Sequence, residues 1–314
     1  MKLQQLRFLR EVARRGLNVS EAAEALHTSQ PGGSKQIRLL EEELGVQILV
    51  RRGKRVVDMT EPGRLVIDIA ERMLRDAENM KKVGEEFGAE DSGTLTIATT
   101  HTQARYALPP IVQRFMQSHP RIRLSLREGS PQQLAEIMRA GAADLAIVTE
   151  RTDLFPDFQM LPCHQWNRCV ITPLQHPLLK EKQISMEAIA RYPIITYDFA
   201  LEPQSPIKRA FDSRNLKPNI ALTAIDSDVI KTYVELRLGI GILAKMAYDP
   251  AHDLGLRLID ASHLFDPSMT HIVLRRHAYL RRFAYEFIEM FAPHLSRSIV
   301  DRTLRGDGGT DYEL

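Results

Sequence analysis

The first 60 residues carry apolar side chains at helical spacing in three short segments separated by turn residues. Gly16 ends the first segment, Asn18 or Ser20 can cap the second, and Ser29 caps the third with Pro31 in its first turn. The inward-facing positions are Leu3, Leu6, Leu9, Val12 and Ala13, then Ala22, Ala23 and Leu26, then Ile37, Leu40 and Leu44. Because a wing-like segment around a glycine turn follows, residues 1–60 predict a winged helix-turn-helix domain.

Residues 61–90 are predicted to form one long helix that opens at the capping residue Thr60. Its apolar positions alternate in steps of four and three residues, and they are Val66, Ala70, Met73, Ala77, Met80, Gly84 and Phe87. A heptad seam within a charged surface favours a coiled-coil linker for dimerisation. The alternative is a helix that packs on its own domain.

From residue 91 the pattern alternates strand-like and helical segments, which predicts α/β lobes with parallel, mostly buried sheets. The expected strands are 94–98, 123–127, 144–148, 170–173, 193–197, 220–224, 240–244 and 271–274. We expect an effector-binding domain over residues 91–300, with lobe I at 93–168 plus 270–300, lobe II at 169–269, and a flexible tail at 301–314. The fold class is therefore α+β multidomain, with a C-terminal part that is two-lobed like periplasmic binding proteins.

A polar turn follows the first expected strand of lobe I. It reads Thr100, His101, Thr102 and Gln103. Hydroxyl and amide groups at a helix N-terminus, beside free backbone N–H groups and the positive end of the dipole, favour an anion. Ligands of parallel sheets bind at the carboxyl ends of strands, so Thr149 and the segment after Tyr197 are expected at the same cleft. The alternative for Thr100 or Thr102 is simple helix capping.

Composition narrows the class of protein. The 314 residues are 44% hydrophobic and 26% charged, an ordinary soluble composition for two or more domains. No stretch has the features of a signal peptide or a bilayer span, which predicts a cytoplasmic protein without membrane association. Cys163 and Cys169 with His164 are an incomplete zinc set, so we expect no metal and no cofactor. The expected cleft lacks a nucleophile with a base and a phosphate-binding glycine loop, which argues against an enzyme.

Positive charge is concentrated at the N-terminus. Residues 1–60 hold eleven Lys or Arg and seven acids, whereas the remainder of the chain carries a net charge of −2. The candidate DNA-binding residues are Thr28, Ser29, Gln30, Pro31, Ser34, Lys35 and Arg38 around the third helix and Arg51, Arg52, Lys54 and Arg55 in the wing. Gln and Lys can read adenine and guanine, and the wing cations suit phosphates. An ordinary solvated helix face is the alternative, and the cationic wing beside it favours DNA binding.

Several longer motifs point to a known family. Residues 21–23 and 29–41 form one set, and residues 99–106, 166–169 and 228–233 form another. With these motifs the chain resembles LysR-type transcriptional regulators over almost its full length, in the CysB and Cbl branch that controls sulfur assimilation. The resemblance implies a homodimer or homotetramer that binds promoter DNA, contacts RNA polymerase and activates sulfur and cysteine biosynthesis genes. It also implies an effector such as acetylserine or sulfate, bound by Thr100, Thr102, Gln103 and Thr149.

Two positions depart from the family's pattern. Glu202 stands where relatives tend to have a threonine, and a carboxylate about 4 Å from a bound anion would cost on the order of 4 kcal/mol at an effective dielectric of about 20. We expect Glu202 either to turn outward or to select an effector with an ammonium group. Gly33 stands where relatives carry a branched apolar residue, so it vacates core volume, and Gly33→Val is expected to raise the melting temperature.

The residues alone leave other functions open. A LysR-type regulator of another sulfur-linked regulon, or of an oxidative-stress regulon, has the same architecture. A two-lobed α/β enzyme and a solute-binding protein are the alternatives that are not regulators. The basic N-terminal domain and the absence of a signal peptide argue against the solute-binding protein.

Overall fold

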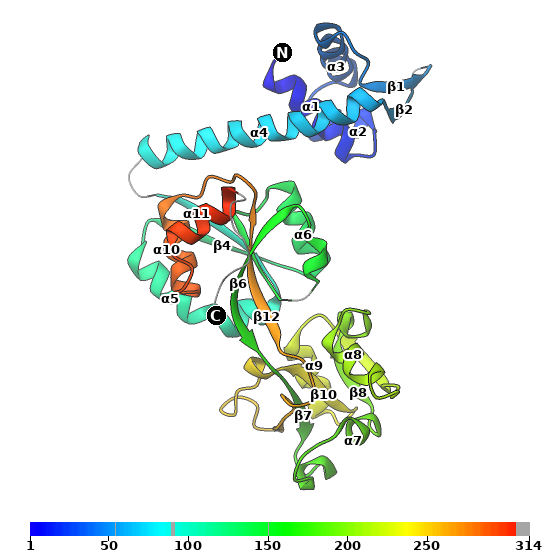
Figure 1. Cartoon of the computed structure of the whole chain (residues 1–314), viewed down its shortest axis with the longest axis vertical. Helices are drawn as coiled ribbons and strands as arrows, with labels where there is room; N and C mark the ends of the chain where they lie inside the picture. The colour runs from blue at the N-terminus through cyan, green and yellow to red at the C-terminus, as the bar shows by residue number, and fades with distance from the viewer. Residues whose placement is uncertain (54, 89–91, 150, 306–314) are drawn as a thin grey trace. The chain divides into compact units, whose positions relative to one another are not determined.

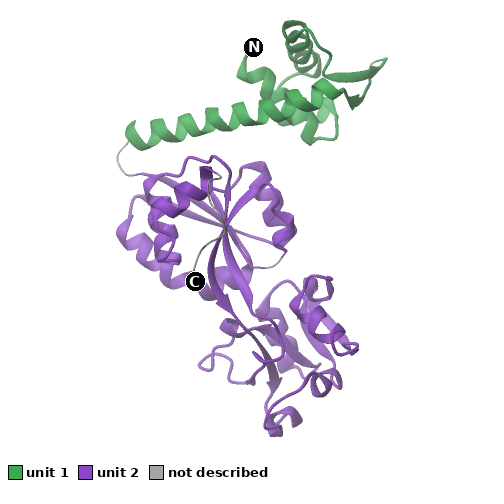
Figure 2. Ribbon diagram, in the orientation of Figure 1, with its two compact units in different colours: residues 1–88 green, residues 89–314 purple. Residues whose placement is uncertain are grey.

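The structure is a computed structural model that describes residues 1–53, 55–88, 92–149 and 151–305. It divides into two compact units, residues 1–88 and residues 89–314 (Figures 1 and 2). The wing residue Lys54 and the last part of the predicted tail, residues 306–314, lie outside the described residues. No described helix is both long enough and apolar enough to cross a membrane.

Unit 1 consists of three short helices, an antiparallel hairpin and one long helix. Their bounds are α1 Leu3–Arg14, α2 Val19–Ala25, α3 Gln30–Leu44, β1 Leu49–Arg52, β2 Arg55–Met59 and α4 Glu61–Gly88. Asn18 caps α2, because its side-chain oxygen accepts from the backbone N–H groups of Ser20 and Glu21. Ser29 caps α3 in the same way by accepting from Gly32. The helix starts are therefore set locally by the residues that the sequence indicated.

The core of unit 1 lies between α1, α2, α3 and the first half of α4. Its buried members are Leu6, Phe8, Leu9, Val12, Ala22, Ala23, Ile37, Leu40, Ile48, Leu49, Ala70 and Leu74. Three positions expected to face inwards, Leu3, Leu26 and Leu44, are instead between 37% and 42% exposed. All three lie at a helix end or just beyond it, where less of the neighbouring helices covers them.

The expectation that Gly33 leaves core volume unfilled is wrong. The ring of Phe8 from α1 occupies that volume: a Cβ atom on Gly33 would stand 1.9 Å from Phe8 Cζ and 2.2 Å from Cε2. Both residues are buried. An aromatic side chain on the neighbouring helix thus compensates for the missing one, and a larger residue at position 33 has to displace Phe8.

The long helix α4 divides into two halves with different surroundings. The first half packs on the core of unit 1 through Ala70 and Leu74, so part of the predicted seam is used inside the unit. The second half leaves large apolar side chains uncovered by other described residues, with Met80 68% and Phe87 83% exposed. Packing on the helix's own domain therefore describes only the first half.

Unit 2 contains two α/β lobes, each built on a five-stranded sheet (Figure 1). In lobe I the strand order is β4-β3-β5-β12-β6, with β4, β3 and β5 parallel to one another. Separate apolar clusters cover its two faces, one with α5, α10 and α11 and the other with α6. The bounds are β3 Gly93–Thr99, η1 Gln103–Ala107, α5 Pro109–Ser118, β4 Ile122–Glu128, α6 Pro131–Ala140, β5 Leu145–Val148, η2 Thr152–Leu154, β6 Phe158–Trp166, β12 Ser268–Arg275, α10 Arg282–Phe291 and α11 Arg297–Arg305.

Lobe II has the strand order β11-β7-β10-β8-β9, in which β10, β8 and β9 are parallel. Its bounds are β7 Arg168–Pro173, η3 Pro177–Lys180, α7 Met186–Ala190, β8 Ile194–Tyr197, η4 Asp198–Leu201, α8 Pro206–Asp212, β9 Ile220–Ala224, α9 Ser227–Glu235, β10 Ile240–Ala244, η5 Lys245–Ala247 and β11 Leu256–Asp260. The chain enters this lobe between β6 and β7 and returns to lobe I along β12.

The prediction of parallel sheets is only partly correct, because each sheet also contains antiparallel strands. β12 runs antiparallel to β5 and β6, and β7 runs antiparallel to β10 and β11. Strands β6 and β11 are absent from the prediction. Strand β6 contains Pro162, and its register with β12 shifts between Thr270 and His271, so its apolar pattern is interrupted.

The predicted boundary of the flexible tail at residue 301 is also wrong. Helix α11 continues to Arg305, and Val300 and Leu304 are buried in the core of lobe I. Helix α11 is amphipathic: its apolar residues face the core, while Arg297, Arg302 and Arg305 are exposed.

Replacing Gly33 by alanine is expected to lower the melting temperature of unit 1, and valine should lower it further. Alanine gains about 1 kcal/mol of helix propensity, but overpacking a core costs about 1–3 kcal/mol, and the contact with Phe8 is severe. Thermal and urea unfolding of the full chain measure the effect. Gly88→Ala at the end of α4 lies outside the predicted seam, and its Cβ would meet no atom within 4 Å; it is the control and should leave the melting temperature almost unchanged. Adding Phe8→Leu to Gly33→Ala should recover part of the loss. A Gly33→Ala chain that melts at or above the wild-type temperature would contradict this account.

Candidate functional site

The candidate DNA-binding residues lie at the start of α3 and in the β1–β2 hairpin. Those that are exposed are Thr28, Ser29, Gln30, Pro31, Lys35, Arg38, Arg51, Arg52 and Arg55. Ser34 is half-buried. Gly53, with φ 62°, forms the hairpin tip between Arg52 and Arg55. A capped helix with polar side chains at its start can enter a major groove, while a cationic hairpin can hold the flanking phosphates.

In unit 2, each lobe has three parallel strands whose carboxyl ends point to one cleft. From lobe I these are β3, β4 and β5, which are followed by residues 100–103, residues 129–131 and Thr149. From lobe II they are β8, β9 and β10, whose ends supply residues 197–199, Ile225 and Ala244. The carboxyl edge of a parallel sheet is where ligands bind in α/β proteins. Two such edges here face each other.

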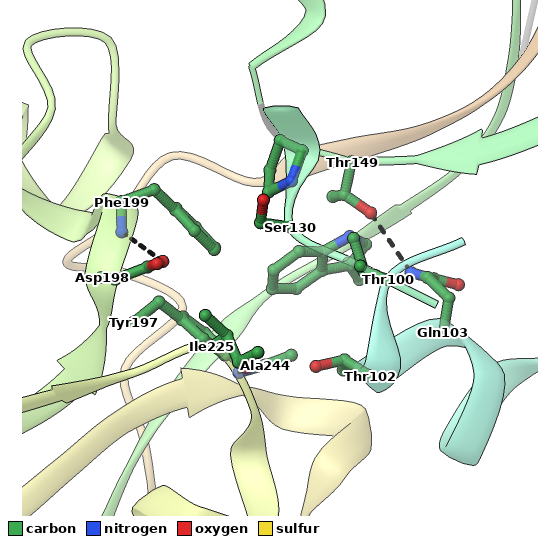
Figure 3. A pocket seen from close by; sticks show the side chains of 13 residues that line it. Thr100, Thr102, Gln103, Ser130, Thr149, Tyr197, Asp198, Phe199, Ile225 and Ala244 are labelled. Carbon is green, nitrogen blue, oxygen red and sulfur yellow. Dashed lines mark hydrogen bonds between the residues drawn. The ribbon is translucent and has the colours of Figure 1, made fainter. Parts of the chain in front are cut away.

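The cleft has about 510 Å³ of space not filled by atoms, part of which is open to solvent. Figure 3 shows Thr100, Thr102, Gln103 and Thr149 on one side and Tyr197, Asp198 and Phe199 on the other. The complete lining is Thr100, Thr102, Gln103, Gly129, Ser130, Pro131, Thr149, Trp166, Tyr197, Asp198, Phe199, Ile225 and Ala244. Hydroxyl groups and apolar rings dominate this lining, and such groups can form hydrogen bonds and ring contacts with a small molecule.

Two side chains give the cleft its hydrogen-bonding character. Gln103 is 1% exposed, and its amide nitrogen donates to the hydroxyls of Thr149 at 3.3 Å and Thr270 at 3.4 Å. The indole N–H of Trp166 is buried without an acceptor among the described residues. A buried donor without a partner is costly. An acceptor atom on a ligand would satisfy it.

Thr102 does not cap the helical segment that follows it. Thr102 makes no capping hydrogen bond, and its Oγ1 lies 3.1 Å from Ser227 Oγ of lobe II. Ser227 Oγ in turn lies 2.8 Å from Tyr197 Oη. Burial raises the pKa of Tyr197, so its hydroxyl stays neutral. The segment from Gln103 to Ala107 is a π-helix, a conformation that is rare and concentrated at functional sites.

Comparison with known proteins matches both parts of the chain to one family. The model of the bacterial regulatory helix-turn-helix protein, lysR family, matches residues 3–64, and the LysR substrate binding domain matches residues 88–296. The chain belongs to the LysR family. It is a DNA-binding transcription regulator and not an enzyme.

Full-length LysR-family relatives are similar to this chain. The HTH-type transcriptional regulator SsuR of Burkholderia cenocepacia is 52% identical over 305 residues, covering 97% of this chain and 99% of the relative. The HTH-type transcriptional regulator CysB of the same species is 48% identical over 314 residues and covers all of both chains. The crystal structure of the cofactor-binding domain of the Cbl transcriptional regulator is 38% identical, with a TM-score of 0.65 over 68% of this chain and 93% of that one. The predicted family and fold class are confirmed.

The structure corrects two candidate effector residues of this LysR-family chain. His101 does not line the cleft: its Nδ1 lies 2.6 Å from Glu128 Oε2, because the side chain turns toward the end of β4. Glu202 does not line it either. Its side chain is 46% exposed and its Oε1 lies 3.6 Å from Arg151 Nη1. The outward orientation is therefore the correct alternative for Glu202.

Asp198 is the carboxylate that sequence reasoning missed. It follows β8 directly and lines the cleft, with its Oδ1 accepting from the N–H of Phe199 at 2.8 Å. The Phe199 ring stacks on Tyr197 at a centroid distance of 5.1 Å. The strand-end rule located this segment without naming the residue, and it could also have found Ser130, which follows β4. Trp166 belongs to the family motif at residues 166–169, and the sequence by itself indicates no role for it.

One group of described residues brings three potential metal-ligand atoms together. Ligand atoms of His101, Asp226 and Asp228 lie within 4.8 Å of one another. Asp228 already pairs with Arg105 at 2.6 Å and Lys231 at 3.1 Å, which offset its charge. We therefore assign these residues to contacts between the lobes.

Both cysteines of this LysR-family chain are buried. Cys163 is 5% exposed and Cys169 0%, and burial raises the pKa of each thiol to about 12. Because the thiolate is the reactive form, neither thiol is suited to rapid oxidation. This finding disfavours a thiol-based oxidative-stress sensor.

The folded chain is expected to resist thiol alkylation at neutral pH, with both cysteines reacting only after unfolding. The reason is the small thiolate fraction that follows from the raised pKa, together with steric burial. Mass spectrometry after iodoacetamide treatment, with and without urea, measures this. Rapid modification of Cys163 or Cys169 in the folded chain would reopen the oxidative-stress function.

Proposed function

We propose that this LysR-family protein regulates genes of sulfur assimilation and cysteine biosynthesis under the control of a small sulfur metabolite in the inter-lobe cleft. The observation that carries the proposal is the cleft chemistry: the threonine hydroxyls and the unpaired Trp166 N–H suit the oxygen atoms of a sulfate or carboxylate group. The similarity to SsuR and CysB supports this regulon rather than another one.

Unit 1 supplies the promoter contact and a dimerisation surface in this proposal. The start of α3 reads bases and the β1–β2 hairpin holds phosphates. The uncovered apolar side chains in the second half of α4, Met80, Val83 and Phe87, pair with those of a second copy. Homodimers assemble further into tetramers and contact RNA polymerase at the promoter, in the cytoplasm.

Effector binding changes the proportion of molecules in each of two relative arrangements of lobes I and II. A ligand held between lobes I and II stabilises one relative arrangement, and the size of the shift is set by its difference in affinity for the two arrangements. That arrangement changes the spacing of the paired dimers and the bend that they impose on DNA.

Charge in the cleft favours one class of effector. Among the described lining residues Asp198 is the only one with a charged side chain, and no Lys or Arg lines the cleft. A carboxylate repels a doubly charged sulfate and attracts an ammonium group. The effector that fits best is therefore a small zwitterion with an acyl or carboxylate oxygen and a free amine, as in O-acetylserine.

The test of this function is DNA footprinting on sulfur-gene promoters with the purified full chain. It is run alone and with sulfate, thiosulfate, N-acetylserine or O-acetylserine. We expect a specific footprint whose length changes with O-acetylserine. A specific footprint that none of the four compounds changes would indicate a LysR-family regulator that responds to another signal.

Asp198→Asn is expected to strengthen sulfate binding by roughly twofold to tenfold and to weaken O-acetylserine binding, since an exposed carboxylate acts through screened Coulomb forces. Calorimetry on the full chain measures both affinities. Asp212→Asn removes the same charge from an exposed carboxylate that pairs with Lys208 within α8 and does not line the cleft, and it should change neither affinity. Equal effects of the two substitutions would contradict the assignment to Asp198.

A further inference from the structure

Three consecutive residues at the start of α9 reach from lobe II to lobe I. They meet the segment from His101 to Tyr106, part of which is the π-helix η1. The pairs are Asp226 with His101 at 3.6 Å, Ser227 with Thr102 at 3.1 Å, and Asp228 with Tyr106 at 2.5 Å and Arg105 at 2.6 Å. We call this set of contacts the inter-lobe bridge. Two of the family motifs noted in the sequence, residues 99–106 and 228–233, meet in it.

Lys231 anchors the bridge within lobe II. Its side chain is 10% exposed, and Nζ donates to the Tyr106 hydroxyl at 2.7 Å and to the carbonyl of Ala247 at 3.0 Å. Nζ also lies 3.0 Å from a carboxylate oxygen of Asp253. The Tyr106 hydroxyl thus donates to Asp228 while it accepts from Lys231. The Tyr106 hydroxyl and the Arg105 guanidinium, both of lobe I, therefore take part in a charged network whose other members belong to lobe II.

Electrostatics keep this network ionised. Burial raises the pKa of Asp228, but the hydrogen bond from Tyr106 and the charges of Lys231 and Arg105 outweigh burial and hold that pKa below its usual value. Burial lowers the pKa of Lys231, and its bonds to Tyr106, Asp253 and Asp228 more than offset this. Withdrawing the Tyr106 hydroxyl would leave a partly buried ion pair with one hydrogen-bond partner fewer.

The bridge is joined to the effector cleft through Ser227. Its Oγ contacts Thr102 and Tyr197, which line the cleft from opposite lobes. Ser227 is completely buried, and it is flanked in sequence by Asp226, which caps α9, and by Asp228. Movement of Asp228 relative to lobe I therefore displaces Ser227 as well. Tyr106, Asp228 and Lys231 themselves do not line the cleft.

We propose that Tyr106 and Asp228 are positioning residues that fix the angle between the lobes and thereby set effector affinity without touching the effector. This inference rests on the proposed function only for the identity of the effector. The bridge favours the arrangement in which Thr102 and Tyr197 are held together. Without it the lobes sample wider angles, and apparent affinity falls in proportion to the population that can bind.

The test uses two conservative variants of the full chain and one matched control. Tyr106→Phe removes a single hydroxyl from the bridge, and Asp228→Asn keeps the shape of the side chain but removes its charge. The control, Tyr248→Phe, removes a tyrosine hydroxyl whose partner, the carbonyl of Leu256, lies in the same lobe. Circular dichroism melting establishes that each variant folds.

The first measurement is the distance between the lobes and needs no effector. Spin labels are placed on cysteines that replace the exposed residues Gln113 of lobe I and Lys217 of lobe II, while both native cysteines stay buried. Labelled chains are diluted into unlabelled ones, and double electron–electron resonance gives the distance distribution. We expect a broader or longer distribution for Tyr106→Phe and Asp228→Asn, and the wild-type distribution for Tyr248→Phe. Wild-type distributions in folded Tyr106→Phe and Asp228→Asn chains would overturn the proposal.

The second measurement is calorimetry with O-acetylserine and sulfate. Each bridge variant should weaken binding by roughly threefold to tenfold, as expected when a stabilising contact of the competent state is lost. The loss of affinity in the double variant should be smaller than the product of the two single losses, because both substitutions weaken the contact between Tyr106 and Asp228. Unchanged affinity, or losses that multiply in the double variant, would refute the link to the effector. If the distances change as expected but wild-type protein binds neither compound, the bridge stands and the effector assignment fails.

Discussion

The chain crosses between its two lobes twice, and the effector cleft depends on this double crossing. The outward crossing joins Trp166 at the end of β6 to Arg168 at the start of β7, and the return begins at Ser268 in β12. Arg168 is 1% exposed and donates to Ser268 Oγ at 2.9 Å and to the carbonyl of Asp266 at 3.4 Å. A buried guanidinium has to be paired. Pairing Arg168 across both crossings holds them side by side and fixes Trp166 at the cleft.

This constraint explains why each sheet has two kinds of strand. Strands β6, β7 and β12 carry the chain between the lobes, and of these β12 in lobe I and β7 in lobe II run antiparallel to their neighbours. The parallel strands of each lobe present their carboxyl ends to the space between the lobes. The inter-lobe bridge at α9 stands beside that space and ties the lobes at a second place. A cleft that is covalently connected on one side and held by hydrogen bonds and ion pairs on the other can open without unfolding. Such an arrangement suits a ligand-controlled regulator.

The sequence predicted correctly those features that depend on residues close together in the chain, and it missed features that depend on distant residues. The predicted strands 220–224 and 240–244 have the bounds observed for β9 and β10, because flanking turns and apolar runs mark them. The caps of α2 and α3 are local hydrogen bonds, and the sequence indicated both. Strand β6 was missed because its pairing with β12 joins residues more than 100 positions apart and its own pattern contains Pro162. In the cleft, the polar turn after the first predicted strand of lobe I pointed to Thr100, Thr102 and Gln103, and the strand-end rule pointed to Thr149; all four line the cleft.

What the sequence by itself determined is the family, the order of the domains, and the strand ends and helix starts near which the functional residues stand. These depend on spacing, capping and charge within short segments. Only the tertiary structure decided that Asp198 rather than Glu202 lines the cleft, that Phe8 fills the space beside Gly33, and that His101 turns toward Glu128. Each of these outcomes depends on packing between segments far apart in the chain, where a side chain's direction is set by the neighbours that the fold brings to it.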